Sequence, residues 1–240
     1  SQAIQVGNIL IDIHERTRTE IENIIEQEKE KSLDFPNTEN WEAYEITSSG
    51  YFYGILHDNL LKLCKENNTK VVINLFKGQF ILDGTIGLLT EKPIDEKLKE
   101  NIMNTLLFNN EELMGENYIY GFRQISEIGV KAMSPGINDP GTALNTIDYL
   151  TSLFLVLMKK WEYEYVSDSD NVNWSRTKCP NFSEVLYNVM ATYRQYCKHD
   201  ITVMRKLMHM LKTLTYHVIN SNQLEDIEIE INELREDAKL

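Results

Sequence analysis

The chain has 240 residues, and its 24 Lys and Arg against 37 Asp and Glu give a formal net charge of −13 at pH 7. Hydrophobic residues make up 42% and charged residues 25% of the sequence, which is ordinary globular usage and excludes a disordered, collagen-like or disulfide-scaffold chain. A surface this acidic repels phosphate backbones, so no nucleic-acid partner is expected.

The N-terminal segment predicts one long amphipathic helix over residues 3–31. This segment lacks Pro and contains a single Gly, and its isoleucines recur at roughly helical spacing among charged residues (Ile4, Ile11, Ile21, Ile24 and Ile25). Pro36 breaks the pattern, so a linker is expected to extend to about residue 40.

Between residues 41 and 92 the sequence becomes β-rich, because aromatic and β-branched residues alternate with Gly-containing turns. Gly50 stands in a predicted turn that uses its freedom to adopt positive φ. Five strands are predicted, at 41–46, 51–55, 71–76, 80–82 and 86–89, with one short helix inserted at about 58–64. Together they predict a small five-stranded subdomain.

From residue 93 to the end, apolar residues recur at helical spacing and predict a bundle of helices. The expected helices span 95–108, 122–133, 140–160, 182–197, 200–220 and 222–236, and a polar loop over 167–178 joins two of them. The predicted fold class is therefore α+β. Its parts are a long N-terminal helix with a linker (1–40), a small five-stranded β-rich subdomain with an inserted helix (41–92) and a mostly α-helical bundle (93–240).

Polar residues repeat at one helical spacing in the segment 122–133. Arg123, Glu127 and Lys131 are four residues apart, so they share one face of the expected helix, opposite a face of apolar and small residues. Glu127 followed by Lys131 has the order that favours an ion pair along a helix. These three side chains are candidate ligand-binding residues.

The corner after this helix, residues 134–142, allows two interpretations. Pro135 ends the helix, and Asn138 or Asp139 can cap the next one, so every residue of the corner has a structural explanation. Alternatively, Ser134, Asn138 and Asp139 join the three charged residues in a small-molecule-binding or enzymatic site, because free amides at a helix N-terminus bind polar ligands. Both interpretations remain open from the sequence.

The sequence contains none of the spacings that identify common catalytic or metal sites. There is no G-x-S-x-G element, phosphate-binding loop, dinucleotide fingerprint or H-x-x-x-H pair. No catalytic residue, metal ligand or cofactor is therefore predicted. The three cysteines, Cys64, Cys179 and Cys197, form no C-x-x-C pair and favour a reducing compartment.

The stretch K-A-M-S-P-G-I-N-D-P-G-T-A at 131–143 resembles the A-L-S-P-G-I-N-D-P-x-T-A signature of the bacterial predicted membrane proteins called domain of unknown function 2254. A G-x-R-Q-x-x-E-I pattern at 121–128 precedes it, as in that family. Weaker similarities lie at Ser49, Gly50 and Tyr51, and at Arg194, Gln195 and Tyr196. The resemblance extends over nearly the whole chain.

This resemblance implies that the chain is the C-terminal, water-soluble portion of a multi-pass bacterial membrane protein, attached to its own transmembrane segment. It implies no known activity. The longest strongly apolar run, 153–158, is too short to span a bilayer, in agreement with a soluble portion. The first hypothesis is a non-enzymatic domain, on the cytoplasmic side, with a role in assembly, ligand sensing or gating. Exposed Ile or Leu on the first and last helices would suit a homo-oligomer.

Overall fold

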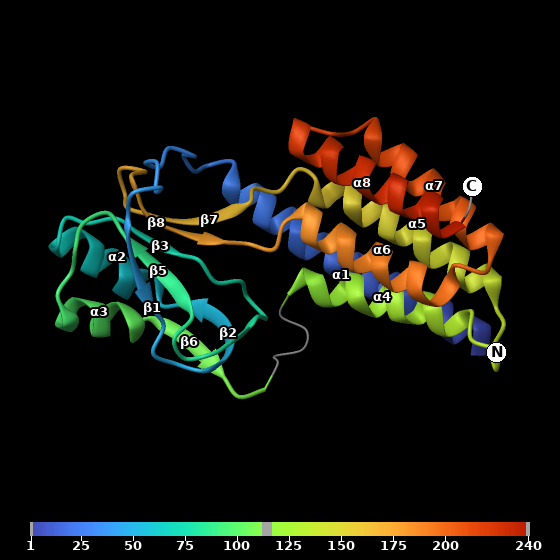
Figure 1. Cartoon of the computed structure of the whole chain (residues 1–240), viewed down its shortest axis with the longest axis horizontal. Coiled ribbons are helices and arrows are strands. Elements are labelled where there is room, and N and C mark those ends of the chain that lie inside the picture. The colour runs from blue at the N-terminus through green and yellow to red at the C-terminus, as the bar shows by residue number, and fades with distance from the viewer. Residues whose placement is uncertain (1, 112–116, 239–240) are drawn as a thin grey trace. The chain divides into compact units, whose positions relative to one another are not determined.

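The computed structural model describes residues 2–111 and 117–238 and divides the chain into two compact units (Figure 1). Unit 1 contains Ser1–Glu26, Gly115–Lys160 and Asn181–Leu240, and unit 2 contains Gln27–Met114 and Trp161–Pro180. Unit 1 is helical, whereas unit 2 holds every strand of the described residues. The predicted α+β class is confirmed.

Unit 1 is a bundle of helices, four of which begin at a side-chain cap. Asn117, Asp139, Asn181 and Asp200 each accept a hydrogen bond from a backbone N–H of the helix that follows. The helices are α1 (Gln2–Glu28), α4 (Tyr118–Ala132), α5 (Pro140–Leu157), α6 (Phe182–Cys197), α7 (Ile201–Thr215) and α8 (Ser221–Ala238). Of the helices in the described ranges, none combines the length and the apolar character needed to cross a bilayer.

The core of unit 1 forms where the apolar faces of these helices meet. Phe122, Ile125, Leu150, Phe154 and Tyr193 are all at most 1% exposed. Each lies on a face that the helical spacing of apolar residues predicts to be buried. This core fixes the spacing of α4, α5 and α6, on which the candidate site depends.

Unit 2 contains two β-sheets. The five-stranded sheet has the order β1-β5-β3-β8-β7, and β3 pairs with β8 in parallel while its other pairs are antiparallel. The antiparallel three-stranded sheet has the order β4-β2-β6. The strands are β1 (Glu42–Glu45), β2 (Gly50–Ile55), β3 (Val71–Ile73), β4 (Phe80–Ile81), β5 (Ile86–Thr90), β6 (Leu106–Asn109), β7 (Tyr163–Ser167) and β8 (Asn173–Lys178), and the helices are α2 (His57–Glu66) and α3 (Glu96–Met103).

Two element predictions are wrong, and both errors involve strands. The helix expected over 95–108 ends at Met103, because Leu106–Asn109 pairs with β2 as strand β6. The loop expected over 167–178 contains strand β8, whose side chains alternate between buried and half-buried positions. The inward residues of β8 are the polar Asn173, Ser175 and Thr177, so its alternation is invisible to a search for apolar periodicity.

All five strands predicted between 41 and 92 are present, but they are divided between the two sheets. Gly50, predicted in a turn, instead begins β2 with φ +137°, and a Cβ there would meet the backbone O of Asn109 at 2.8 Å. The two compact units do not follow the predicted segments 1–40, 41–92 and 93–240. Residues 161–180 join the β-rich unit because β7 and β8 extend its larger sheet.

Candidate functional site

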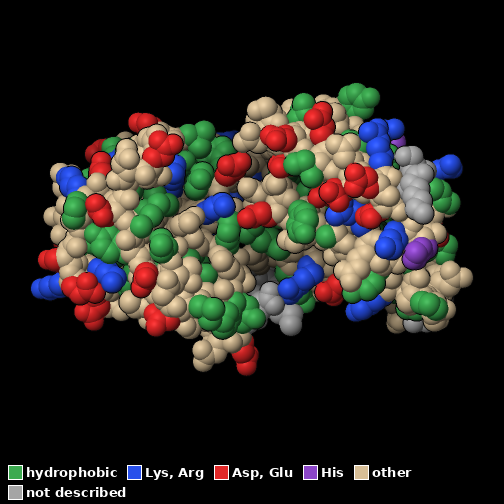
Figure 2. All heavy atoms as spheres, in the orientation of Figure 1, with side chains coloured by type: hydrophobic (Ala, Val, Ile, Leu, Met, Phe, Trp, Pro, Cys, Tyr) green, Lys and Arg blue, Asp and Glu red, His purple; other side chains and the backbone are tan. Residues whose placement is uncertain are grey.

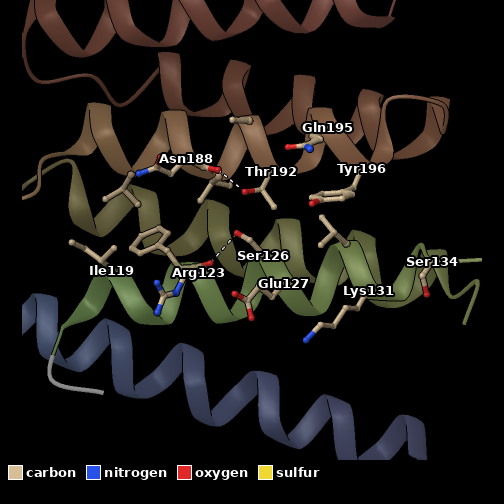
Figure 3. Close-up of a pocket in the computed structure, with 15 residues that line it drawn as sticks. Ile119, Arg123, Ser126, Glu127, Lys131, Ser134, Asn188, Thr192, Gln195 and Tyr196 are labelled. Atoms are coloured by element: carbon tan, nitrogen blue, oxygen red, sulfur yellow. Dashed lines mark hydrogen bonds between the residues drawn. The ribbon is translucent and has the colours of Figure 1, made fainter. Parts of the chain in front are cut away.

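A groove of about 800 Å³ lies within unit 1 between α4 and α6 (Figure 3). Its floor is apolar and includes Phe122, Val185 and Val189, which are all at most 5% exposed. Its edges are polar and come from both helices. A groove with an apolar floor and polar edges is suited to an amphipathic ligand.

The structure brings four of the six predicted site residues together along this groove. Arg123, Glu127, Lys131 and Ser134 line its α4 side, whereas Asn138 and Asp139 are not among the lining residues. The first three side chains are exposed. Figure 3 shows their charged ends along the outer edge of α4, on the side turned away from α6. They therefore form a charged lip and do not converge on a reaction centre.

The ion pair expected between Glu127 and Lys131 is not formed. Within the described part of the chain neither side chain has an ion-pair partner. Arg123 instead lies 5.2 Å from the ring centre of Tyr120 in a cation–π contact. The lip thus carries one carboxylate, that of Glu127, with one cation on either side of it along α4.

The α6 wall of the groove was not predicted. Asn188, Thr192, Gln195 and Tyr196 line it, and Tyr196 is 64% exposed. These residues recur at spacings of three and four, so they share one helix face, and their polar character on an otherwise apolar helix was a usable signal. What the sequence could not provide was the packing of this face beside α4.

Two small hydroxyls in the groove, those of Ser126 and Thr192, already have partners in the helix backbone. Ser126 Oγ donates to the carbonyl O of Phe122 at 2.8 Å, and Thr192 Oγ1 donates to that of Asn188 at 2.8 Å. Neither bonds a histidine or a carboxylate, as a catalytic nucleophile would. Both hydroxyls are thus engaged by the backbone of their own helices.

The corner between α4 and α5 is closed by its own hydrogen bonds. The carbonyl O of Ser134 accepts from the N–H groups of Ile137 and Asn138 at 3.0 and 2.9 Å, and Asp139 N donates to Ala132 O at 2.7 Å. Asn138 adopts φ +47°, a conformation that Asn tolerates better than most residues. The backbone geometry thus accounts for the corner without a ligand.

Asp139 caps α5, as the first interpretation predicts. Its Oδ1 accepts from Thr142 N at 3.1 Å and its Oδ2 from Thr142 Oγ1 at 2.6 Å. The bond from the Thr142 hydroxyl, and after it the bond from the Thr142 N–H, hold the pKa of Asp139 below its ordinary value. Both carboxylate oxygens are occupied, so Asp139 has a structural role.

Replacing Asp139 by alanine is expected to lower the free energy of unfolding by about 1 kcal/mol at pH 7. Because the pKa of Asp139 is lower in the folded chain, this stabilisation is present above the unfolded pKa and is lost as the pH falls through the folded pKa. Urea unfolding between pH 2 and 7 measures the difference. Asp139→Asn, which keeps a capping side chain, should lower the free energy of unfolding less than Asp139→Ala does at pH 7. A pH-independent difference would contradict this account.

Three helices approach closely at Gly129 of α4. A Cβ at Gly129 would collide with the hydroxyl oxygens of Tyr193 on α6 and Thr146 on α5. Those two hydroxyls lie 2.7 Å apart and share a hydrogen bond, and both residues are 0% exposed. Burial raises the pKa of Tyr193, which keeps its hydroxyl protonated. Gly129 therefore sets the distance between the two walls of the groove.

In the stretches 2–111 and 117–238, no three His, Cys, Asp or Glu side chains are arranged to hold a metal ion. The polar groups available to a ligand are therefore those of the lip and of the α6 wall.

The chain is similar to uncharacterized proteins of Mycobacterium bovis and Mycobacterium tuberculosis, each 19% identical over 247 residues. The similarity covers 95% of this chain but 46% of each relative, so the chain spans about half the length of the curated relatives it matches. No solved structure matches it significantly. The family described as "Predicted membrane protein (DUF2254)" matches residues 1–213, which include both walls of the groove and the corner. The chain therefore belongs to this family of predicted membrane proteins.

Proposed function

We propose that this chain is the ligand-sensing domain of a membrane protein and that the groove between α4 and α6 binds a small amphipathic anion. The observation that carries the proposal is the groove itself, with its apolar floor of Phe122, Val185 and Val189 and its charged lip. An apolar chain can lie on the floor, while the head group reaches the lip.

The charge of the lip favours an anionic head group. Arg123 and Lys131 are eight residues apart on α4, about 12 Å along the helix, and Glu127 lies between them. The lip thus carries an excess of one positive charge, in a chain whose net charge is −13. The long Arg and Lys side chains can follow a head group that emerges from the groove.

The family supports a role in a membrane protein. The relatives contain about as much sequence again outside the region of similarity, and we place the membrane-spanning helices of the whole protein there. Cys64, Cys179 and Cys197 are free thiols, which favours a cytoplasmic position for this domain. Binding in the groove would then change the packing of α4 against α6, and this change would be passed on to the membrane part.

Calorimetric titration with decanoate, below its micelle concentration, tests the proposal. We expect saturable binding, and we expect Ala191→Trp, which fills the groove from α6, to abolish it. The matched control is Asn145→Trp, at an exposed position of α5 outside the groove, which should bind as the unmodified chain does.

The lip is tested by reversing its charge. Arg123→Glu combined with Lys131→Glu should weaken decanoate binding at least about tenfold and leave binding of the uncharged decanol unchanged, because only the head group meets the lip. Far-UV circular dichroism should show that both variants remain folded. Absence of decanoate binding, or equal binding by Ala191→Trp, would refute the proposed site, and turnover of added esters or phosphate esters would refute the non-enzymatic role.

A further inference from the structure

Two neighbouring helices of unit 1 carry opposite charge. α7 contains three Lys and Arg residues and no carboxylate, whereas α8 contains seven carboxylates and one Arg. Figure 2 shows acidic side chains over α8, and Lys, Arg and His side chains beside them over α7. In a chain with a net charge of −13, α7 is a local exception.

The exposed residues of α7 and of its C-cap form one stripe. Besides Thr202, they are Ile201, Arg205, His209, Lys212 and Tyr216, which recur at spacings of three and four and so lie within an arc of about 80°. The stripe is basic at its centre and apolar at its ends, where Ile201 is 47% and Tyr216 87% exposed. Exposed aromatic and aliphatic side chains beside cations are typical of protein interfaces.

The solvent face of α8 is complementary to this stripe. Glu225, Glu228 and Glu236 are exposed on it, and Ile229 is 51% exposed between them. The buried residues of α8, such as Ile227 and Leu234, lie on the opposite side of the helix. One face is thus basic with apolar ends, and the other is acidic with an apolar centre.

These charges are not used within the chain. Among the residues that the structure describes, none of Arg205, Lys212, Glu225, Glu228 and Glu236 has an ion-pair partner. Other charges of the same helices do have partners: Lys206 Nζ lies 2.6 Å from Asp148 Oδ1, and Glu233 Oε2 lies 3.3 Å from Arg194 Nη1. The outward stripes therefore remain available to a partner.

We infer that α7 and α8 form the interface of a symmetric dimer, in which α7 of one copy lies on α8 of the other. α7 and α8 run antiparallel on either side of the short connection 216–220. A two-fold axis parallel to both helices places each basic stripe on the acidic face of the second copy, so that the same contact forms twice. Two-fold symmetry thus pairs the basic stripe of α7 and the acidic face of α8 of both copies in a single interface.

The register of this dimer follows from the short connection between α7 and α8. Lys212 precedes the connection by about one turn, and Glu225 follows it by about one turn, so the two lie at similar heights. In the dimer, Lys212 of each copy faces Glu225 of the other.

The area is sufficient for a specific but modest association. α7 has 15 and α8 has 18 residues, so the two helices present a face of about 20 by 25 Å and bury about 1,000 Å² over both copies. Exposed isoleucines also occur on α1, but Ile9 and Ile11 are two residues apart and point to different sides of the helix. They do not form a comparable stripe.

Sedimentation velocity over a range of protein concentrations, combined with charge reversal, tests the dimer. We expect the unmodified chain to dimerise, and Lys212→Glu or Glu225→Lys alone to weaken dimerisation at least about tenfold because like charges then face each other. The double variant Lys212→Glu with Glu225→Lys should restore it. Lys97→Glu, an equal charge change at an exposed position of α3 in unit 2, is the matched control and should have no effect.

A chain that stays monomeric at all concentrations would overturn the inference, as would a double variant that is no better than the single ones. A monomer that binds vesicles of anionic phospholipid, and loses that binding in Lys212→Glu, would assign the basic stripe to a membrane surface instead. Dissociation caused by Ile9→Glu, with no effect of Lys212→Glu, would place the contact on α1 and also overturn it.

Discussion

Replacing Gly129 by alanine is expected to destabilise unit 1 by about 2 kcal/mol or more, although alanine is the better helix former. Removing Gly from a helix interior gains about 1 kcal/mol. Against this, the new methyl group would collide with the buried hydroxyls of Tyr193 and Thr146. Overpacking of a well-packed core costs about 1–3 kcal/mol, and displacing the hydrogen bond between these hydroxyls adds about 1–3 kcal/mol.

Urea unfolding of the chain measures this effect, and Gly7→Ala is its matched control. Gly7 also lies inside a helix, α1, but a Cβ there would have no atom within 4 Å. Gly7→Ala should therefore show the helix-forming gain alone and stabilise the chain by up to about 1 kcal/mol.

The double variant Gly129→Ala with Tyr193→Phe separates steric collision from a general loss of helix packing. Removing the Tyr193 hydroxyl removes one of the two collisions of the new methyl group, while Thr146 Oγ1 stays in place through its bond to Ala143 O at 2.6 Å. The double variant should consequently be more stable than the sum of the single changes predicts. If the losses of stability in the two single variants simply add in the double variant, the collision with the Tyr193 hydroxyl is not the cause.

The sequence predicted the α4 side of the site because its signals are local. Arg123, Glu127 and Lys131 share a face through spacing alone, and Asp139 followed by Pro140 is typical of a helix start. In the structure the three residues line the groove and Asp139 caps α5, while a ligand-binding role for them stays a prediction. The resemblance to the family rests on the same stretch and was confirmed.

What the sequence could not supply was pairing between distant segments. Strand β8 pairs in parallel with β3, about 100 residues away, and its inward residues are polar, so no local pattern identifies it. Strand β6 was assigned to a helix because Leu98, Ile102 and Leu106 recur every four residues and so fit helical spacing, and only pairing with β2 decides between the two. The α6 wall of the groove could not be predicted for the same reason, because its residues line a groove only through their position beside α4.

Replacing Arg194 by methionine is expected to cost about 3 kcal/mol at pH 8, because it leaves a buried carboxylate without its counter-ion. Arg194 on α6 is 13% exposed in its side chain and bridges three carboxylates of α8: Glu230 at 3.4 Å, Glu233 at 3.3 Å and Asp237 at 3.5 Å. Glu230 is the most buried of them, at 4% exposure of the residue. A methionine fills much of the same volume, so the expected loss is mainly electrostatic.

The pH dependence identifies the group responsible. Burial raises the pKa of Glu230 to about 6 even though Arg194 acts in the opposite direction. Because this pKa is higher than in the unfolded chain, the folded state holds more protons, and the contribution of Glu230 to stability is lost as the pH rises through about 6. Without Arg194 the pKa rises further, so the cost of Arg194→Met should fall to less than half at pH 5, where Glu230 is protonated.

Urea unfolding at pH 5 and pH 8 tests this account with two further variants. Glu230→Gln in the Arg194→Met background should recover most of the loss at pH 8, because the glutamine leaves no buried charge behind. Arg16→Met, at an arginine of α1 whose side chain is 56% exposed, should change stability by less than about 0.5 kcal/mol at either pH. If Arg194→Met costs the same at both pH values and Glu230→Gln gives no recovery, the loss comes from the packing of α6 on α8, and the buried charge of Glu230 is not its cause.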